Sequence, residues 1–145
     1  MPDDADAARA FVRLQLAGTR YRARLEEQLE SALQFEDPEY MALLALDDDE
    51  TLLALALFGT VAGARHCVKL HAIVGIEERA MTTLVAGIAH LCDHSGERLI
   101  VCELPDDVPW DRGAAVLLAN GYREEGRVPD YLRDGVALRL LVRRL

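Results

Sequence analysis

The chain has 145 residues, of which 51% are apolar and 28% charged. This composition is typical of a folded globular protein and excludes a disordered segment, and the length suffices for one hydrophobic core. We therefore expect residues 1–145 to form a single domain. The 16 basic and 25 acidic residues give a net charge of -9, which would repel nucleic acid and anionic lipid. We expect neither a nucleic-acid partner nor a membrane partner.

The N-terminal residues and the cysteines indicate a cytoplasmic location. Residues 1–6 are acidic and lack the basic and apolar stretches of a secretory signal, and no apolar run reaches the length of a membrane span. Cys67, Cys92 and Cys102 are odd in number, form no CxxC pair and lie within apolar stretches. We expect them to be reduced thiols that pack as small hydrophobic side chains.

Two helices are predicted at the start of the chain. Apolar residues recur at helical spacing over residues 7–16, and Asp3, Asp4 and Asp6 precede them at the end where a helix dipole favours anions. A second amphipathic helix is predicted from Tyr21 to Phe35, ending before Pro38.

Three strands are predicted next. Residues 40–46 and 51–61 are apolar and flank an acidic turn, which favours a hairpin, although their many Leu and Ala residues leave a helix open. Residues 67–76 alternate, so that Val68, Leu70, Ala72 and Val74 share one face. Lys69, His71 and Ile73 are then expected together on the opposite face.

The remaining elements complete an α/β (α+β) order. We expect a helix over 77–94, a strand over 98–104, a short helix over 111–119, a strand and turn over 122–134 and a last strand over 136–142. The strand–helix–strand crossover through 77–94 implies one parallel pair in a mostly antiparallel sheet.

This order, with Glu103-Leu104-Pro105 leaving a strand and a C-terminal run that contains Gly121 and Tyr122, resembles the GNAT superfamily of N-acyltransferases. The resemblance covers roughly residues 40–145. It implies the GNAT fold, a mixed sheet with helices on both faces, in which the parallel pair splays at the acyl-CoA cleft. It also implies acetyl-CoA as the cofactor. The family usually begins with a strand, and here a helix is expected first.

The resemblance implies a set of acyl-CoA-binding positions at the end of one strand and the start of the following helix: Ile73, Val74, Arg79, Ala80, Thr82, Thr83 and Leu84. The family motif is Arg or Gln, two variable residues, Gly, one variable residue, and Gly or Ala. Here Thr82 replaces the first Gly and Leu84 replaces the second small residue. A side chain obstructs the close approach that Gly permits, so we expect weak binding through main-chain amides, the threonine hydroxyls and Arg79.

The family's usual acid is also altered, because its Tyr position four residues before Gly121 is Leu117. Tyr122 is a possible substitute acid, although an aromatic residue after a helix-ending Gly also serves as a core plug. Tyr131 is a second possible substitute. His71 and Glu103 are the candidate bases, although a surface His and a solvated Glu are the more common interpretation of such residues.

Other polar clusters carry weaker hypotheses. His90 and His94 have a spacing that can bind a metal, but sequence fixes no third ligand, so no metal site is predicted. Asp106 and Asp107 could attract a cationic amine or simply be solvated. Apolar sheet edges make a homodimer plausible.

Two functions remain open. The first is an acetyl-CoA-dependent N-acyltransferase acting on a small-molecule or protein amine, with His71 or Glu103 as the base. The second is a catalytically silent GNAT-like module that binds a metabolite or a partner protein.

Overall fold

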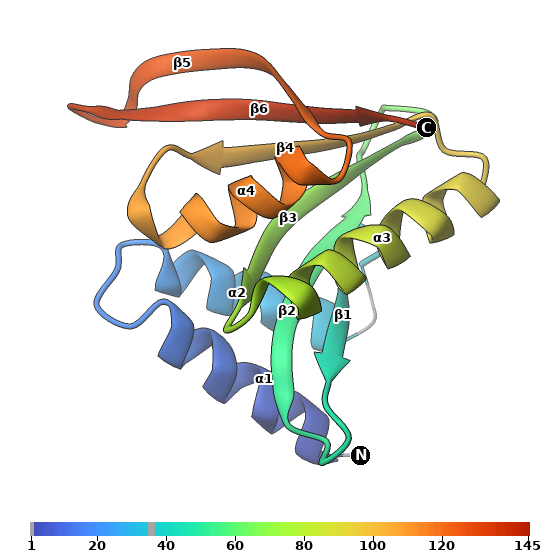
Figure 1. Cartoon of the computed structure of the whole chain (residues 1–145), viewed down its shortest axis with the longest axis vertical. Coiled ribbons are helices and arrows are strands. Elements are labelled where there is room, and N and C mark those ends of the chain that lie inside the picture. Colours follow the sequence, from blue (N-terminus) through green and yellow to red (C-terminus); the bar gives the residue numbers. More distant parts are fainter. Residues whose placement is uncertain (1, 35–36) are drawn as a thin grey trace.

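The computed structural model describes residues 2–34 and 37–145, and Figure 1 shows how their elements are arranged. The elements run in the order α1 (Pro2–Gln15), α2 (Arg22–Leu33), β1 (Met41–Leu46), β2 (Leu52–Thr60), β3 (Cys67–Gly75), α3 (Glu78–His94), β4 (Leu99–Pro105), α4 (Asp111–Ala119), β5 (Arg123–Arg133) and β6 (Val136–Arg144). A single 3-10 turn, Val108–Trp110, leads into α4.

The six strands form one sheet in the order β1-β2-β3-β4-β6-β5. Neighbouring strands are antiparallel except for β3 and β4, which are parallel and joined by the α3 crossover. The predicted fold class, with one parallel pair in a mostly antiparallel sheet, is confirmed.

Helices cover both faces of the sheet (Figure 1): α1 packs with α2, and α3 packs with α4. On the α3 side, a Cβ placed on Gly75 would meet Met81 of α3 at 2.6 Å and Ala54 of β2 at 3.1 Å. Because β2 is covered on both faces, its side chains from Ala54 to Phe58 are all buried. A strand buried on both faces is expected to be a continuous apolar run. The Leu- and Ala-rich segments are therefore strands, and the helical alternative is wrong.

The N-terminal region differs from expectation in its bounds. Helix α1 begins at Pro2 and not near residue 7, in keeping with the fixed φ of proline, which suits a first helical turn. The end of the second predicted helix, at Phe35, lies outside the described residues. Within the described residues no strand precedes α1, and β1 forms one edge of the sheet.

No helix in the two described stretches combines the length and the apolar character that crossing a membrane requires.

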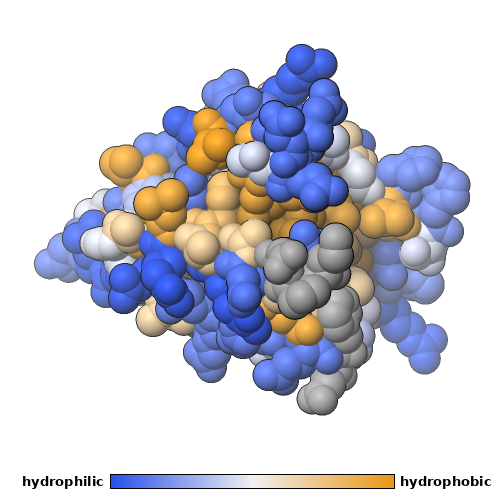
Figure 2. All heavy atoms as spheres, turned by 90° about the horizontal axis from the view of Figure 1, so that it is seen from below, coloured by the Kyte–Doolittle hydropathy of each residue, from blue (hydrophilic) through white to orange (hydrophobic). Residues whose placement is uncertain are grey.

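The end of the molecule at the bottom of Figure 1 is not wholly hydrophilic. Viewed from that end, Figure 2 shows apolar side chains in the middle of the face with hydrophilic side chains around them. The sheet edge carries apolar residues that are not fully covered, since Met41 and Leu46 at the two ends of β1 are 41% and 44% exposed.

Candidate functional site

The two parallel strands separate after the first three residues of each. β3 and β4 pair only from Cys67 to Lys69 and from Leu99 to Val101. Directly after this point β3 contains a bulge: Leu57 and Phe58 of β2 pair with Ala72 and Leu70, so that His71 is the extra residue. A bulge bends its strand and disrupts the local pairing. It therefore accounts for the divergence of β3 from β4.

The bulge also corrects the predicted faces of β3. Strict alternation would put Lys69, His71 and Ile73 on one face. Instead, His71 and Ala72 line the same hollow together with Lys69, and Ile73 packs against α4 on the other side of the sheet. The alternation predicted for residues 67–76 holds before His71 and is reversed after it.

Two hollows lie beside the divergence. The first, which we name the α2 cleft, has a volume of about 400 Å³ and is lined by side chains of Arg20 and Tyr21, of α2, of β3 and β4, and of the β5–β6 hairpin. The second, which we name the α4 pocket, has a volume of about 350 Å³ and lies between the ends of α1 and β3 and the start of α4. His71 and Glu103 both line the α2 cleft, so the structure brings together the two candidate bases.

His71 is held by contacts with the segment before β1. Its Nε2 lies 2.7 Å from the Glu39 carbonyl oxygen, and its ring stacks on Tyr40 with the centroids 4.7 Å apart. A carbonyl only accepts, so Nε2 carries the proton in this contact. Burial lowers the pKa of His71 below its usual 6.5, and the nearby charges of Lys69 and Arg24 lower it further, against the raising effect of the Glu39 carbonyl. The ring is therefore neutral at pH 7, with a lone pair on Nδ1.

Glu103 faces the same cleft from β4 but is differently placed. Its Oε2 lies 3.7 Å from Lys69 Nζ across the parallel pair, and its side chain is 49% exposed. A half-exposed ion pair at this distance contributes little to stability. The pair nevertheless neutralises Glu103, the only carboxylate among the described residues that line the cleft.

The two tyrosines occupy different surroundings. Tyr122 is 3% exposed, its hydroxyl has no hydrogen-bond partner among the described residues, and burial raises its pKa above the usual 10.0. It does not line the α2 cleft, whereas Tyr131 does and is 61% exposed. The role of Tyr122 as an acid stays a prediction.

The start of α3 holds most of the predicted acyl-CoA positions. Only Ile76 and Glu77 connect β3 to α3. Glu77 is the N-cap residue of α3, but its side chain accepts no hydrogen bond from the first turn of the helix. Ala80 and Leu84 are buried in the core. The Leu84 side chain therefore points away from the helix end and does not obstruct the approach to it, in contrast to the expectation from the sequence. The Thr83 hydroxyl donates to the Arg79 carbonyl at 3.0 Å, inside the helix. Glu77 and Glu78 place negative charge where a helix would favour an anion.

Helix α4 covers the edge of β3 where the family resemblance places acyl-CoA. A Cβ placed on Gly113 would lie 3.0 Å from both Cγ2 and the carbonyl oxygen of Ile73. The Arg112 guanidinium donates to the carbonyl oxygens of Gly75 and Ile76 at 3.2 and 3.1 Å. The side chains of Ile73 and Val74 are themselves 1% and 5% exposed. The α4 pocket lies beside this contact, and Ile73, Val74 and Gly113 are among the residues that line it.

Sequence reasoning missed the basic side of the α2 cleft. Arg20 and Arg24 line it, and Tyr21 and Trp110 form an edge-to-face pair in its wall with ring centroids 5.6 Å apart. The Tyr21 hydroxyl donates to Asp107 at 2.7 Å, and burial followed by this contact raises the pKa of Tyr21 to about 12. The missed signal was the presence of Arg22 and Arg24 in the first turn of a helix, where anions are favoured.

The His90 and His94 rings lie 4.3 Å apart on α3, and His94 Nδ1 contacts the His90 carbonyl oxygen at 3.2 Å. Within the parts of the chain that the structure describes, no group of three potential metal ligands is found.

Comparison with known proteins shows likeness to solved structures and none to family models or curated sequences. No family model matches the sequence, and no curated protein matches it. An acetyltransferase structure of the GNAT family from Desulfovibrio desulfuricans is 18% identical with a TM-score of 0.80, covering 99% of this chain and 94% of that one. The aminoglycoside 6'-N-acetyltransferase from Enterococcus faecium is 16% identical with a TM-score of 0.78, covering 99% and 92%.

A third structure, ribosomal-protein-alanine N-acetyltransferase from Brucella melitensis, is 15% identical with a TM-score of 0.71, covering 100% of this chain and 96% of that one. At these identities the likeness concerns the fold. The chain has the GNAT acetyltransferase fold, as the resemblance predicted for residues 40–145, and the structural likeness extends to 99% of the chain.

Proposed function

We propose that this chain is a ligand-binding module built on the GNAT acetyltransferase fold, which uses the α2 cleft and does not take up acyl-CoA beside β3. The observation that carries the proposal is the contact of Gly113 with Ile73, because it holds α4 close to β3 and so narrows the α4 pocket, which both residues line. The two hydrogen bonds from Arg112 tie α4 to the same edge.

Two further features support the proposal. The connection between β3 and α3 is two residues long, and the acidic Glu77 and Glu78 stand at the helix end where the pyrophosphate of acyl-CoA would have to be bound. Leu117 is fully buried and cannot donate a proton, and the hydroxyl of its possible substitute, Tyr122, is buried in the core.

Calorimetric titration of the purified chain with acetyl-CoA and with CoA tests the proposal. We expect neither heat nor a thermal shift at about 1 mM ligand, which corresponds to only about 4 kcal/mol of binding. A dissociation constant well below that concentration would overturn the proposal. Arg112→Ala is an informative companion, because it frees the carbonyl groups of Gly75 and Ile76: binding gained by this variant alone would mean that α4 keeps the site closed.

The geometry of His71 favours a second candidate, an N-acyltransferase acting on a small-molecule or protein amine. A neutral ring with its Nε2 proton donated to Glu39 leaves Nδ1 able to accept a proton from an amine in the α2 cleft. Glu103 is the alternative base. If any turnover of acetyl-CoA with an amine is found, His71→Ala and Glu103→Gln should separate the two. Turnover unchanged in both folded variants would exclude these bases.

A further inference from the structure

We propose that the α2 cleft binds a small organic anion, a carboxylate or phosphate attached to an apolar body, through the guanidinium groups of Arg20 and Arg24. This inference deepens the proposed function and rests on it, since it names the ligand class of the same cleft.

Arg20 and Arg24 line the α2 cleft and have no acidic partner among the described residues. The other arginines without such a partner do not line this cleft: Arg65, Arg79, Arg98, Arg112, Arg123 and Arg143. In the described parts of the chain no carboxylate lies within ion-pair distance of Arg20 or Arg24. On α1 and α2, arginines that point away from the cleft are paired: Arg9 with Glu30 at 2.6 Å, and Arg22 with Glu26 at 3.8 Å.

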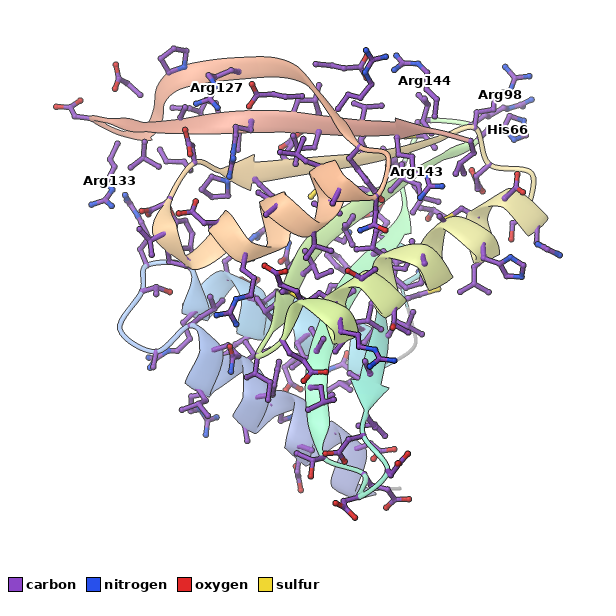
Figure 3. The ribbon with its side chains drawn as sticks, in the orientation of Figure 1. His66, Arg98, Arg127, Arg133, Arg143 and Arg144 are labelled. Atoms are coloured by element: carbon purple, nitrogen blue, oxygen red, sulfur yellow. The ribbon has the colours of Figure 1, made fainter. Side chains whose placement is uncertain are left out.

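On the β5–β6 hairpin, Figure 3 labels Arg127, Arg133, Arg143 and Arg144. Three of them meet a carboxylate: Arg127 meets Asp106 at 2.6 Å, Arg133 meets Asp107 at 3.3 Å and Arg144 meets Glu125 at 2.7 Å. Arg143 donates instead to the Asn120 carbonyl oxygen at 3.0 Å. In a chain with 25 acidic residues and a net charge of -9, Arg20 and Arg24 lie together in the wall of one cleft without a carboxylate partner among the described residues. Their positive charge is left available to a ligand.

The position of the pair works against local stability. Arg24 is in the first turn of α2 and Arg20 precedes it, and this first turn carries no acidic residue and no side-chain cap. Cations at a helix N-terminus are disfavoured by the helix dipole and repel each other. Residues that break a local rule without a structural compensation are most often found where function requires them.

The rest of the cleft fits one anionic group and an apolar body. Among the described residues that line the cleft, Glu103 is the only carboxylate, and it forms an ion pair with Lys69. These two charges cancel and His71 is neutral, so the net positive charge of the lining comes from Arg20 and Arg24. Leu25, Trp110 and Leu138 supply apolar surface beside them. A volume of about 400 Å³ suits a small molecule. Arginine forks bind carboxylate and phosphate in a bidentate manner.

Binding of matched probes by the full chain tests the inference. We would titrate phenylacetate and phenyl phosphate, with phenethylamine as the probe of opposite charge, and follow binding by amide chemical shifts. The two anion probes compare a carboxylate with a phosphate on a similar apolar body. We expect shifts at the start of α2 and in β3 with one or both anions at about 10 mM and none with the amine. Added salt should weaken binding.

Arg20→Gln with Arg24→Gln should weaken anion binding by about tenfold or more. Arg22→Gln is the control, because Arg22 lies on the same helix outside the cleft and pairs with Glu26. Equal loss in the double variant and the control, or no binding of either anion by the folded wild-type chain, would overturn the inference.

The outcome is distinguishable from failure of the proposed function. Acetyl-CoA that binds beside β3 would perturb α3 and the amides near Arg112, and its affinity would not change in the Arg20→Gln, Arg24→Gln variant. Acetyl-CoA captured only through its phosphates in the α2 cleft would lose affinity in that variant, and would support the anion site.

Discussion

Gly113 of α4 and Ile73 of β3 are in contact so close that even one methyl group on the glycine would press on the strand: its Cβ would lie 3.0 Å from Cγ2 and from the carbonyl oxygen of Ile73. The carbonyl belongs to the strand backbone and cannot move aside as a side-chain end can. The contact therefore fixes how near α4 lies to β3.

Replacing Gly113 with Ala should lower the free energy of unfolding by about 1 kcal/mol, because the steric cost exceeds the gain in helix propensity. Gly87→Ala is the matched control. It also lies inside a helix, but its nearest neighbour would be Leu43 Cδ2 at 3.8 Å, so this substitution should stabilise by up to about 1 kcal/mol. Urea unfolding of both variants measures the difference, and equal stabilisation would contradict the tight contact.

Gly59→Ala should be more damaging and should disturb His71. A Cβ on Gly59 would lie 2.1 Å from the Glu39 carbonyl oxygen, which is the group that contacts His71 Nε2. We expect a loss of more than about 2 kcal/mol and a changed His71 resonance. Gly126→Ala in β5, with its nearest contact at 3.5 Å, should change stability by less than about 0.5 kcal/mol. A normal His71 signal in the Gly59 variant would mean that Glu39 does not position the ring.

The titration of His71 should make stability depend on pH in a defined direction. The pKa of His71 is lowered below 6.5 in the folded chain, mainly by burial, and returns to about 6.5 on unfolding. Below about pH 6.5 the unfolded state therefore binds more protons at this position, and the free energy of unfolding falls as the pH decreases toward the folded pKa. Above about 6.5 this contribution is constant.

Urea unfolding at about pH 7.5 and about pH 5.5 measures this effect, and an NMR titration gives the folded pKa directly. His71→Gln should show a smaller loss of stability between the two pH values than the wild type. The same loss in both proteins would assign the pH dependence to other groups.

The three thiols should differ in reactivity in the order of their burial. Burial raises the pKa of all three, that of Cys102 to about 12. Cys67 is half-buried, whereas Cys92 and Cys102 are buried. Alkylation of the native chain at about pH 8, followed by mass spectrometry, should label Cys67 slowly and the other two only after unfolding. Native labelling of Cys102 at the rate of Cys67 would contradict the packing around β4.

Periodicity and turn residues were sufficient to predict the order of the α-helices and strands in the described chain, but not the 3-10 turn Val108–Trp110 or the full length of β5. The Leu- and Ala-rich segments of β1 and β2 were the uncertain ones, because their intrinsic preference does not favour strands and their burial on both faces depends on the rest of the fold. The start of α1 was placed five residues late for a local reason, since Pro2 suits the first helical turn.

The candidate site was predictable only in part. His71 and Glu103 do share a cleft, but the faces of β3 were wrong beyond His71, because a bulge depends on the register with β2 and leaves no mark in the apolar pattern. Arg20 and Arg24 were missed because the sequence does not show which charged side chains line a cleft or which of them lack a carboxylate partner. The close approach of Gly113 to Ile73 depends on a distance between elements that are remote in sequence.

The bulge at His71 divides β3 into two parts whose side chains alternate in opposite order between the two faces of the sheet. Up to Leu70 the strand presents one set of side chains to each face, and after the extra residue the sets are exchanged, so that His71 opens on the α2 cleft and Ile73 meets α4. Deleting His71 would restore simple alternation and leave Leu70 and Ala72 opposite their present partners, Phe58 and Leu57, so Ile73 would still face α4. The bulge therefore adds an imidazole and a bend to the wall of the α2 cleft without changing the layer that the rest of β3 faces.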